Sequence, residues 1–215
     1  MPAVRGLFAH TLPVVVLVLG IAPAHARVVP APTEGRPPPV YIPASDPGDE
    51  PRTSAVPIEG SSLVRGRAIV NVRAPLARVR DTILDFAHYP EFMPHYEVCR
   101  VLGTTQTGGR DVYMRIAAVH GVVKMWARIE VAKPTIADGV ETYRSRYVDG
   151  NIKDLQATWS VKPVDDKTTQ LTVEVFMNPK LPLPDALVNN ENLDGARAAV
   201  LAFKARAEGK KLAEK

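Results

Sequence analysis

The chain has 215 residues, of which 46% are hydrophobic and 23% are charged, a balance that is typical of soluble globular proteins. Its 14 glycines and 20 prolines follow no period and it has a single cysteine, which excludes a collagen-like protein, a disulfide scaffold and a metal site built from several cysteines. The formal net charge of +4 is too small to be the electrostatic footprint of a nucleic-acid-binding protein.

The first 26 residues have the three-part layout of a secretory signal peptide. Arg5 lies near the start, an apolar run follows over residues 12–21, and Ala24-His25-Ala26 has the small residues of a cleavage site. The apolar run is about half as long as the ~20 residues that a membrane-spanning helix needs. We therefore expect cleavage after Ala26 and a secreted or periplasmic protein, with a retained membrane anchor as the alternative.

Residues 27–60 contain nine of the 20 prolines and few large apolar side chains. A segment of this composition cannot bury enough apolar surface to order itself, and consecutive prolines favour the extended polyproline conformation. The sequence therefore predicts a signal peptide over residues 1–26, a proline-rich disordered leader over 27–60 and a single domain over 61–215.

The domain is predicted to begin with a strand and short helices. Over residues 67–73, Ala68, Val70 and Val72 alternate with polar side chains, which is the period of a strand with one buried face. Pro75 then opens a helix whose apolar residues recur at spacings of three and four, ending near Ala87. Residues 88–94 contain two prolines among aromatic residues and predict a second, short helical turn.

Six more strands and a long helix complete the predicted order. Short turns separate the strands, which are predicted over residues 96–102, 111–119, 122–131, 140–147, 153–161 and 170–177. Consecutive strands without helices between them form an antiparallel sheet that needs cover on one face. A last helix, which follows Leu181-Pro182-Leu183-Pro184 and ends near Glu208, is the natural cover. The fold class is therefore α+β, with a curved antiparallel seven-stranded sheet wrapped around the last helix.

Local patterns in this order resemble one known superfamily. They are Ala74-Pro75-Leu76 with Leu84-Asp85-Phe86, the run Tyr89-Pro90-Glu91-Phe92-Met93-Pro94, Asp149-Gly150 with Trp159, and Leu181-Pro182-Leu183-Pro184 with Leu187. The chain over about residues 63–208 resembles the START-like or SRPBCC superfamily of helix-grip proteins, most strongly its polyketide cyclase/dehydrase and coenzyme Q-binding branch. The resemblance implies a helix-grip fold that holds an apolar or amphipathic molecule between the sheet and the last helix.

Strand alternation indicates which side chains face that space. The methionines are adaptable apolar contacts, Trp159 offers an indole N–H, and Tyr143 and Tyr147 offer hydroxyl groups to a ligand oxygen. Plain core packing is the alternative for each. The candidate ligand-binding residues are Met114, Met125, Tyr143, Tyr147, Trp159, Val173, Val175, Met177 and Leu187.

Catalytic and metal-binding patterns are weak in this sequence. His88 and His95 flank the short aromatic helix and His120 lies in a predicted turn, so no histidine is clearly directed into the cavity. No pair of histidines has a metal-ligand spacing, and Cys99 is predicted to be a buried, inert strand residue. We expect no catalytic residue, no metal site and no cofactor.

The predicted function is exported binding or transfer of a hydrophobic small molecule, such as a lipid or a quinone. One alternative is a cyclase, aromatase or dehydratase in which Tyr143, Tyr147 or Asp85 positions protons, and another is an interaction module with a filled core. The aromatic residues within 89–96 could form an exposed rim that contacts a membrane transiently. The alternative is that these side chains close one end of the sheet. We expect a monomer and no nucleic-acid partner.

Overall fold

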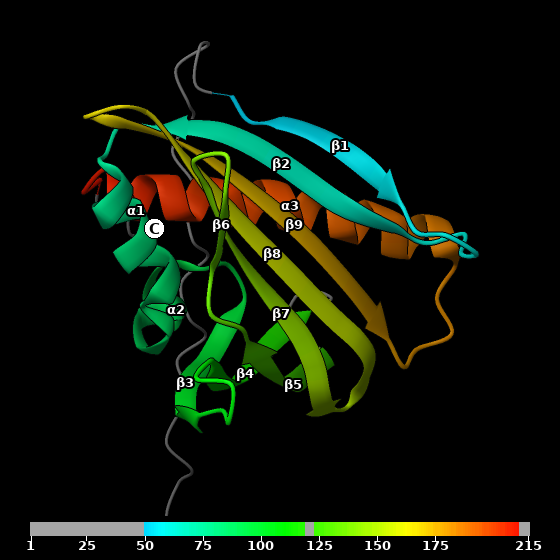
Figure 1. Ribbon diagram of the computed structural model, residues 1–215. Helices are drawn as coiled ribbons and strands as arrows, with labels where there is room; N and C mark the ends of the chain where they lie inside the picture. The colour runs from blue at the N-terminus through cyan, green and yellow to red at the C-terminus, as the bar shows by residue number, and fades with distance from the viewer. Residues whose placement is uncertain (1–49, 119–122, 211–215) are drawn as a thin grey trace, which may run out of the picture. The chain divides into compact units, whose positions relative to one another are not determined.

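The computed structural model describes residues 50–118 and 123–210 of the chain (Figure 1). The described residues lie within one compact unit. The predicted signal peptide, residues 27–49 of the predicted leader and the turn at His120 lie outside them.

The domain consists of one antiparallel sheet and one long helix, with short helices after the second strand. The elements are β1 (Arg52–Pro57), β2 (Val64–Val72), α1 (Leu76–Leu84), the 3₁₀ turn η1 (Phe86–His88), α2 (Tyr89–Phe92), β3 (Tyr96–Thr104), β4 (Arg110–Ala118), β5 (Val123–Val131), β6 (Thr135–Ala137), β7 (Val140–Gly150), β8 (Ile152–Asp165), β9 (Thr168–Pro179) and α3 (Asp185–Ala207). The strands lie in the order β1-β2-β9-β8-β7-β5-β4-β3, with β6 paired to β7. Figure 1 shows α3 running along one face of this sheet. The predicted helix-grip architecture is confirmed.

Two strands were not predicted from the sequence, so over the described residues the sheet has nine strands and not seven. Strand β1 lies in the stretch assigned to the disordered leader, and it pairs with β2 from Arg52 opposite Ile69 to Pro57 opposite Val64. Strand β6 pairs with β7 across the Asp138-Gly139 turn, where both residues have positive φ. Both strands are short and largely exposed, so backbone pairing orders them without an alternating apolar pattern.

The side of the sheet that faces α3 carries the apolar core. Along β5, Met125, Ala127 and Ile129 are buried while Lys124 and Arg128 are exposed, as the alternation predicts. The same face holds buried side chains from β2, β4, β8 and β9, among them Ala68, Val70, Val72, Val112, Met114, Trp159, Val161, Leu171 and Val173. The predicted inner face is therefore correct for these strands.

A close contact fixes the first half of α3 against β2 and β9. A Cβ atom on Gly66 would lie 1.9 Å from the carbonyl oxygen of Asn192, so the helix backbone takes the place of a side chain there. The buried Asn192 amide accepts the N–H of Met177 at 2.9 Å and donates to the carbonyl of Val64 at 3.0 Å. These bonds satisfy backbone groups of two strands at once, which sets where the helix crosses the sheet.

An aromatic cluster joins η1 and α2 to the second half of α3. Tyr89 makes edge contacts with Phe92, Tyr96 and Phe203, at centroid distances of 5.5–5.6 Å. Its hydroxyl donates to the carbonyl of Ile83 at 2.5 Å. Tyr89 and Phe92 are both buried, so this segment packs into the fold and does not form an exposed aromatic rim.

Within the described ranges, no helix combines the length and the apolar character that crossing a bilayer requires.

Candidate functional site

The predicted site residues fall into three groups by burial. Five are buried in the core between sheet and helix: Met114, Met125, Tyr143, Trp159 and Val173. Three share the same face but are only partly buried: Tyr147, Val175 and Met177. Leu187, at the start of α3, is 43% exposed, so the structure does not bring it together with the others. The strand residues were placed by alternation, which does not apply to the first turn of a helix.

Burial along the inner face is less complete toward one end of the strands, although Leu155 and Ile152 of β8 remain buried there. The cross-strand pair Val161 and Leu171 is fully buried, and Trp159 opposite Val173 is nearly so. The next pair, Ala157 and Val175, is only partly buried although both residues face α3. The same partial burial holds near the ends of β4, β5, β7 and β9, at Ile116, Val123, Tyr147 and Met177. The inner face is thus a packed core that continues into an incompletely covered apolar wall.

The sheet opens between β7 and β8 beside this wall. Their backbone ladder joins residues 141–144 to residues 158–161, and from Ser145 onward β7 pairs with β5 instead. Beyond the ladder, the Ser145 hydroxyl accepts the N–H of Ala157 at 2.8 Å and donates to its carbonyl at 3.2 Å. Closer to the turn, the Tyr147 hydroxyl donates to the carbonyl of Ile152 at 3.0 Å. Side chains therefore hold this hairpin where the ladder between its strands ends.

A charged group stands on the inner face near the start of β7. Glu141 is 6% exposed, and Arg80 from α1 donates to its carboxylate at 2.7–3.1 Å. The Tyr143 hydroxyl donates to the same carboxylate. Burial alone would raise the pKa of Glu141, but the hydrogen bonds from Arg80 and Tyr143 outweigh it and hold the pKa below its ordinary value. Burial, together with Glu141, raises the pKa of Tyr143, which keeps its hydroxyl protonated.

The Arg80–Glu141 pair was not predicted from the sequence. Glu141 has the same strand parity as Tyr143, which indicates an inward carboxylate, and a buried carboxylate needs a cationic partner. The partner lies 61 residues away in the chain, on a helix surface, where no local pattern marks it.

The groups that an enzymatic function would need are each bonded elsewhere. Tyr143 donates to Glu141, Tyr147 donates to the Ile152 carbonyl, and Asp85 lies 2.5 Å from the Nδ1 atom of the exposed His88. The hydrogen bond that the protonated His88 ring donates to the Asp85 carboxylate raises the pKa of His88. Across residues 50–118 and 123–210, no three histidine, cysteine or acidic side chains gather in a metal-binding arrangement.

We expect Cys99 to be unreactive in the folded protein. Its side chain is 5% exposed, and burial raises the pKa of the thiol to about 12, so the reactive thiolate is scarce at neutral pH. Ellman's reagent should therefore modify one thiol per chain in denaturant and react far more slowly without it. Rapid native labelling would contradict the buried placement.

Comparison with known proteins relates this geometry to a family. The model of the family described as polyketide cyclase / dehydrase and lipid transport matches residues 72–203, whereas no curated protein matches the chain. A STAR-related lipid transfer protein from Xanthomonas axonopodis has a similar fold, with a TM-score of 0.64 and 19% identity over 76% of this chain and 96% of that one. Human STARD10 is similar with a TM-score of 0.62 and 12% identity, over 76% of this chain and 74% of that one.

An enzyme shares the architecture as well. The Zhui aromatase/cyclase from Streptomyces sp. R1128 has a TM-score of 0.50 and 19% identity, over 67% of this chain and 93% of that one. At such identities these similarities show a shared fold and do not assign a ligand or a reaction. Because the family model covers more than half of the sequence, the chain belongs to the polyketide cyclase/dehydrase and lipid transport family.

Proposed function

We propose that this protein binds or transfers a hydrophobic small molecule, such as a lipid or a quinone, between its sheet and α3. The observation that carries the proposal is the apolar wall at Ile116, Val123, Tyr147, Ala157, Val175 and Met177, which faces the helix yet is only partly buried. Burial of an acyl or prenyl chain contributes about 0.8 kcal/mol per CH₂ group, so such a wall supplies affinity without a reacting group.

Binding is favoured over catalysis by the bonding of the inner polar groups. The hydroxyls of Tyr143 and Tyr147 already donate to protein acceptors, and Asp85 is bonded to an exposed histidine. The structurally similar protein from Xanthomonas axonopodis, which is named as a STAR-related lipid transfer protein, supports this proposal. The signal-peptide pattern adds that the protein acts after export, in the periplasm or outside the cell. In such a compartment, transfer would involve brief contact with a membrane.

The direct test is native mass spectrometry of the protein, purified without detergent from an exporting host, followed by solvent extraction. We expect a discrete added mass that extraction releases as a lipid or a quinone. If the protein carries no added mass and takes up none of a panel of phospholipids, fatty acids and quinones, the proposal is wrong.

A large side chain placed on the apolar wall should prevent the protein from retaining its hydrophobic ligand. Ala157→Trp places an indole beside Val175, and we expect at least a tenfold loss of bound ligand, since displacing even two CH₂ groups costs about 1.6 kcal/mol. Thr158→Trp is the matched control, because the next residue on β8 points to the opposite face. Ligand occupancy by native mass spectrometry and thermal melting measure retention and folding separately. Equal retention in both folded variants would contradict the assigned wall.

A further inference from the structure

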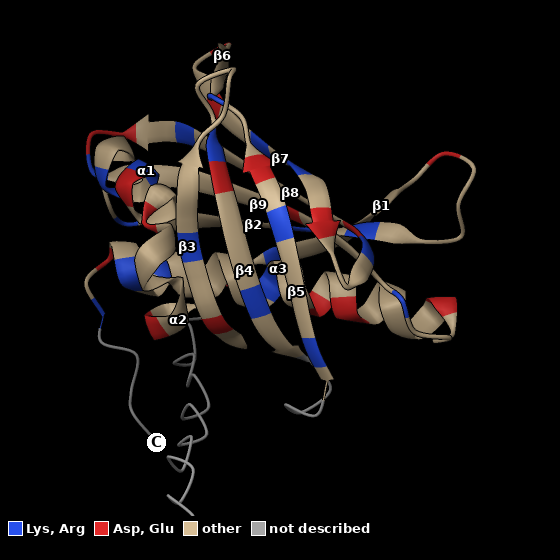
Figure 2. Ribbon diagram, turned by 90° about the horizontal axis from the view of Figure 1, so that it is seen from below, with Lys and Arg blue, Asp and Glu red and all other residues tan. Residues whose placement is uncertain are grey.

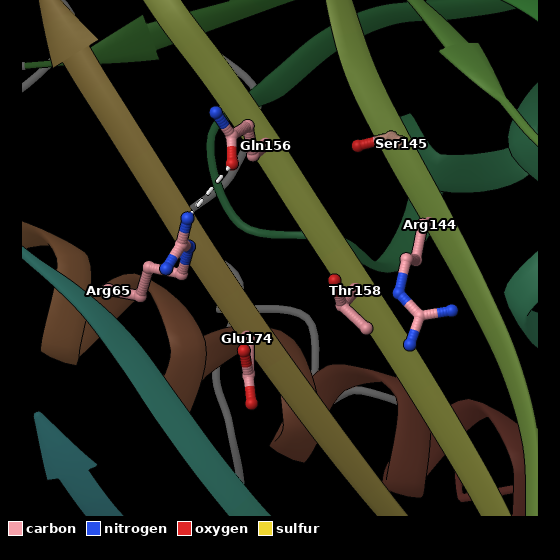
Figure 3. A pocket seen from close by; sticks show the side chains of 6 residues that line it. All are labelled: Arg65, Arg144, Ser145, Gln156, Thr158 and Glu174. Carbon is pink, nitrogen blue, oxygen red and sulfur yellow. Dashed lines mark hydrogen bonds between the residues drawn. The ribbon is translucent and has the colours of Figure 1, made fainter. Parts of the chain in front are cut away.

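A pocket lies on the face of the sheet that points away from α3. It has a volume of about 280 Å³ and is lined by Arg65, Arg144, Ser145, Gln156, Thr158 and Glu174 (Figure 3). These residues come from β2, β7, β8 and β9, which are neighbours in the sheet. Except for Ser145, they alternate with residues that face the helix side, such as Gly66, Tyr143 and Trp159. The pocket therefore opens on the outer face, and Ser145, whose hydroxyl bonds to the backbone of Ala157, is its one lining residue with the inner-face parity.

The charges around this pocket differ from those on the rest of the outer face. Figure 2 shows basic and acidic residues interspersed on β4 and β5. There, Arg128 pairs with Asp111 at 2.6 Å and Arg115 with Glu97 at 2.8 Å. Within the described ranges, by contrast, Arg65 bonds only to the neutral Gln156, at 3.3 Å, and Arg144 only to the neutral Thr135, at 3.1 Å. Two guanidinium groups that have no carboxylate partner in the described part of the chain thus border one pocket.

The single acid of the pocket does not cancel this charge. Glu174 accepts from Arg67 at 2.6–2.7 Å, so its negative charge is already balanced by a third arginine. The Thr158 hydroxyl, which has no hydrogen-bond partner among the described residues, adds a neutral donor between the two arginines. The local balance is two positive charges with a hydroxyl donor, which suits a negatively charged ligand.

We propose that this pocket binds the phosphate group of a small molecule or lipid headgroup, held between Arg65 and Arg144. Three strand spacings separate β2 from β7, about 14 Å, and in Figure 3 the Arg65 guanidinium lies over β9 and the Arg144 guanidinium lies between β7 and β8, with Thr158 between the two arginines. The planar guanidinium presents paired donors that match phosphate oxygens. The volume corresponds to roughly nine waters at ~30 Å³ each, which leaves room for an organic substituent beside the phosphate. The site does not depend on the proposed hydrophobic ligand.

The test measures binding of inorganic phosphate and of glycerol 3-phosphate by NMR titration at constant ionic strength. We expect saturable shifts around Arg144 and Thr158, and an affinity about tenfold lower in Arg65→Gln and in Arg144→Gln, since each loses charge-assisted hydrogen bonds. Arg128→Gln is the control, because it removes the same charge from the same face away from the pocket. Its affinity should equal that of the unaltered protein.

A variant that is expected to bind phosphate more tightly shows that weaker binding in the arginine variants does not come from misfolding. Glu174→Gln removes the acid from the pocket and releases Arg67 from its ion pair, so phosphate should bind more tightly. The proposal is overturned if neither probe binds saturably, or if Arg128→Gln weakens binding as much as Arg65→Gln. Binding to vesicles with and without phosphatidic acid distinguishes a lipid headgroup from a soluble molecule as the source of the phosphate group. Arginine-dependent vesicle binding would show a lipid headgroup, and binding of glycerol 3-phosphate alone a soluble ligand.

Discussion

Replacing Gly66 with alanine is expected to lower the free energy of unfolding by about 3 kcal/mol. The new Cβ atom would lie 1.9 Å from the Asn192 carbonyl oxygen and 2.7 Å from the amide nitrogen of Leu193. Both are backbone atoms of α3, so no side-chain rotation relieves the clash. The helix would have to move away from β2, which would stretch the two hydrogen bonds of the Asn192 amide.

Thermal and urea unfolding measure this effect, and we expect the Tm to fall by roughly 6–12 °C for a domain of this size. Gly103→Ala is the matched control, because a Cβ atom there would meet no atom within 4 Å. It should change the stability by no more than about 0.5 kcal/mol. If the two variants melted together, the close approach of α3 to β2 would be incorrect.

Replacing Arg80 with methionine is the second large expected effect. The change leaves the Glu141 carboxylate, 6% exposed, without its cation. Removing one partner from a fully buried pair costs about 3–5 kcal/mol. Because the Arg80 side chain is itself 39% exposed, solvent screens the pair, and we expect a loss of about 2 kcal/mol at pH 7.

The pH dependence distinguishes this cause from a general packing defect. In the unaltered protein the pKa of Glu141 lies below its ordinary value of 4.5, so its ionised form stabilises the fold above that pH and the contribution is lost as the pH falls through the folded pKa. Without Arg80, the remaining hydrogen bond from Tyr143 no longer outweighs the effect of burial, so the pKa of Glu141 should rise. As the pH falls, the difference in stability between the two proteins should therefore narrow, first above pH 4.5, where the variant's Glu141 takes up a proton, and then below it, where the unaltered protein loses its contribution.

Denaturant unfolding at a series of pH values measures that difference. Arg128→Met provides the control, since Arg128 donates to Asp111 through Nε and Nη2 on the outer face, where the Asp111 side chain is 18% exposed compared with 8% for Glu141. The control should lose much less stability than Arg80→Met. A difference between Arg80→Met and the unaltered protein that stays constant from pH 7 to pH 3 would argue against the buried carboxylate as its cause.

The core strands and their inward faces could be predicted because burial leaves a period in the sequence. Met114, Met125, Trp159 and Val173 alternate with polar residues, and each proved to be buried. Strands β1 and β6 could not be predicted in this way. Their residues are mostly exposed, and their order comes from hydrogen bonds to β2 and β7, which leave no periodic pattern.

The candidate sites depended far more on tertiary structure. Alternation placed Val173 and Val175 on the same face, but only the packing of α3 made one fully buried and left the other partly exposed. Leu187 was counted among the ligand-binding residues from a motif at the start of the last helix, whereas the helix orientation leaves it exposed.

The sequence by itself determined the order of the core elements and which side of each strand is apolar, since both follow from local periodicity. Only the tertiary structure decided the partners of charged groups, because Arg80 meets Glu141, and Arg65 lies across the outer pocket from Arg144, through contacts between distant parts of the chain. Such pairings depend on strand order and register, which no local pattern encodes.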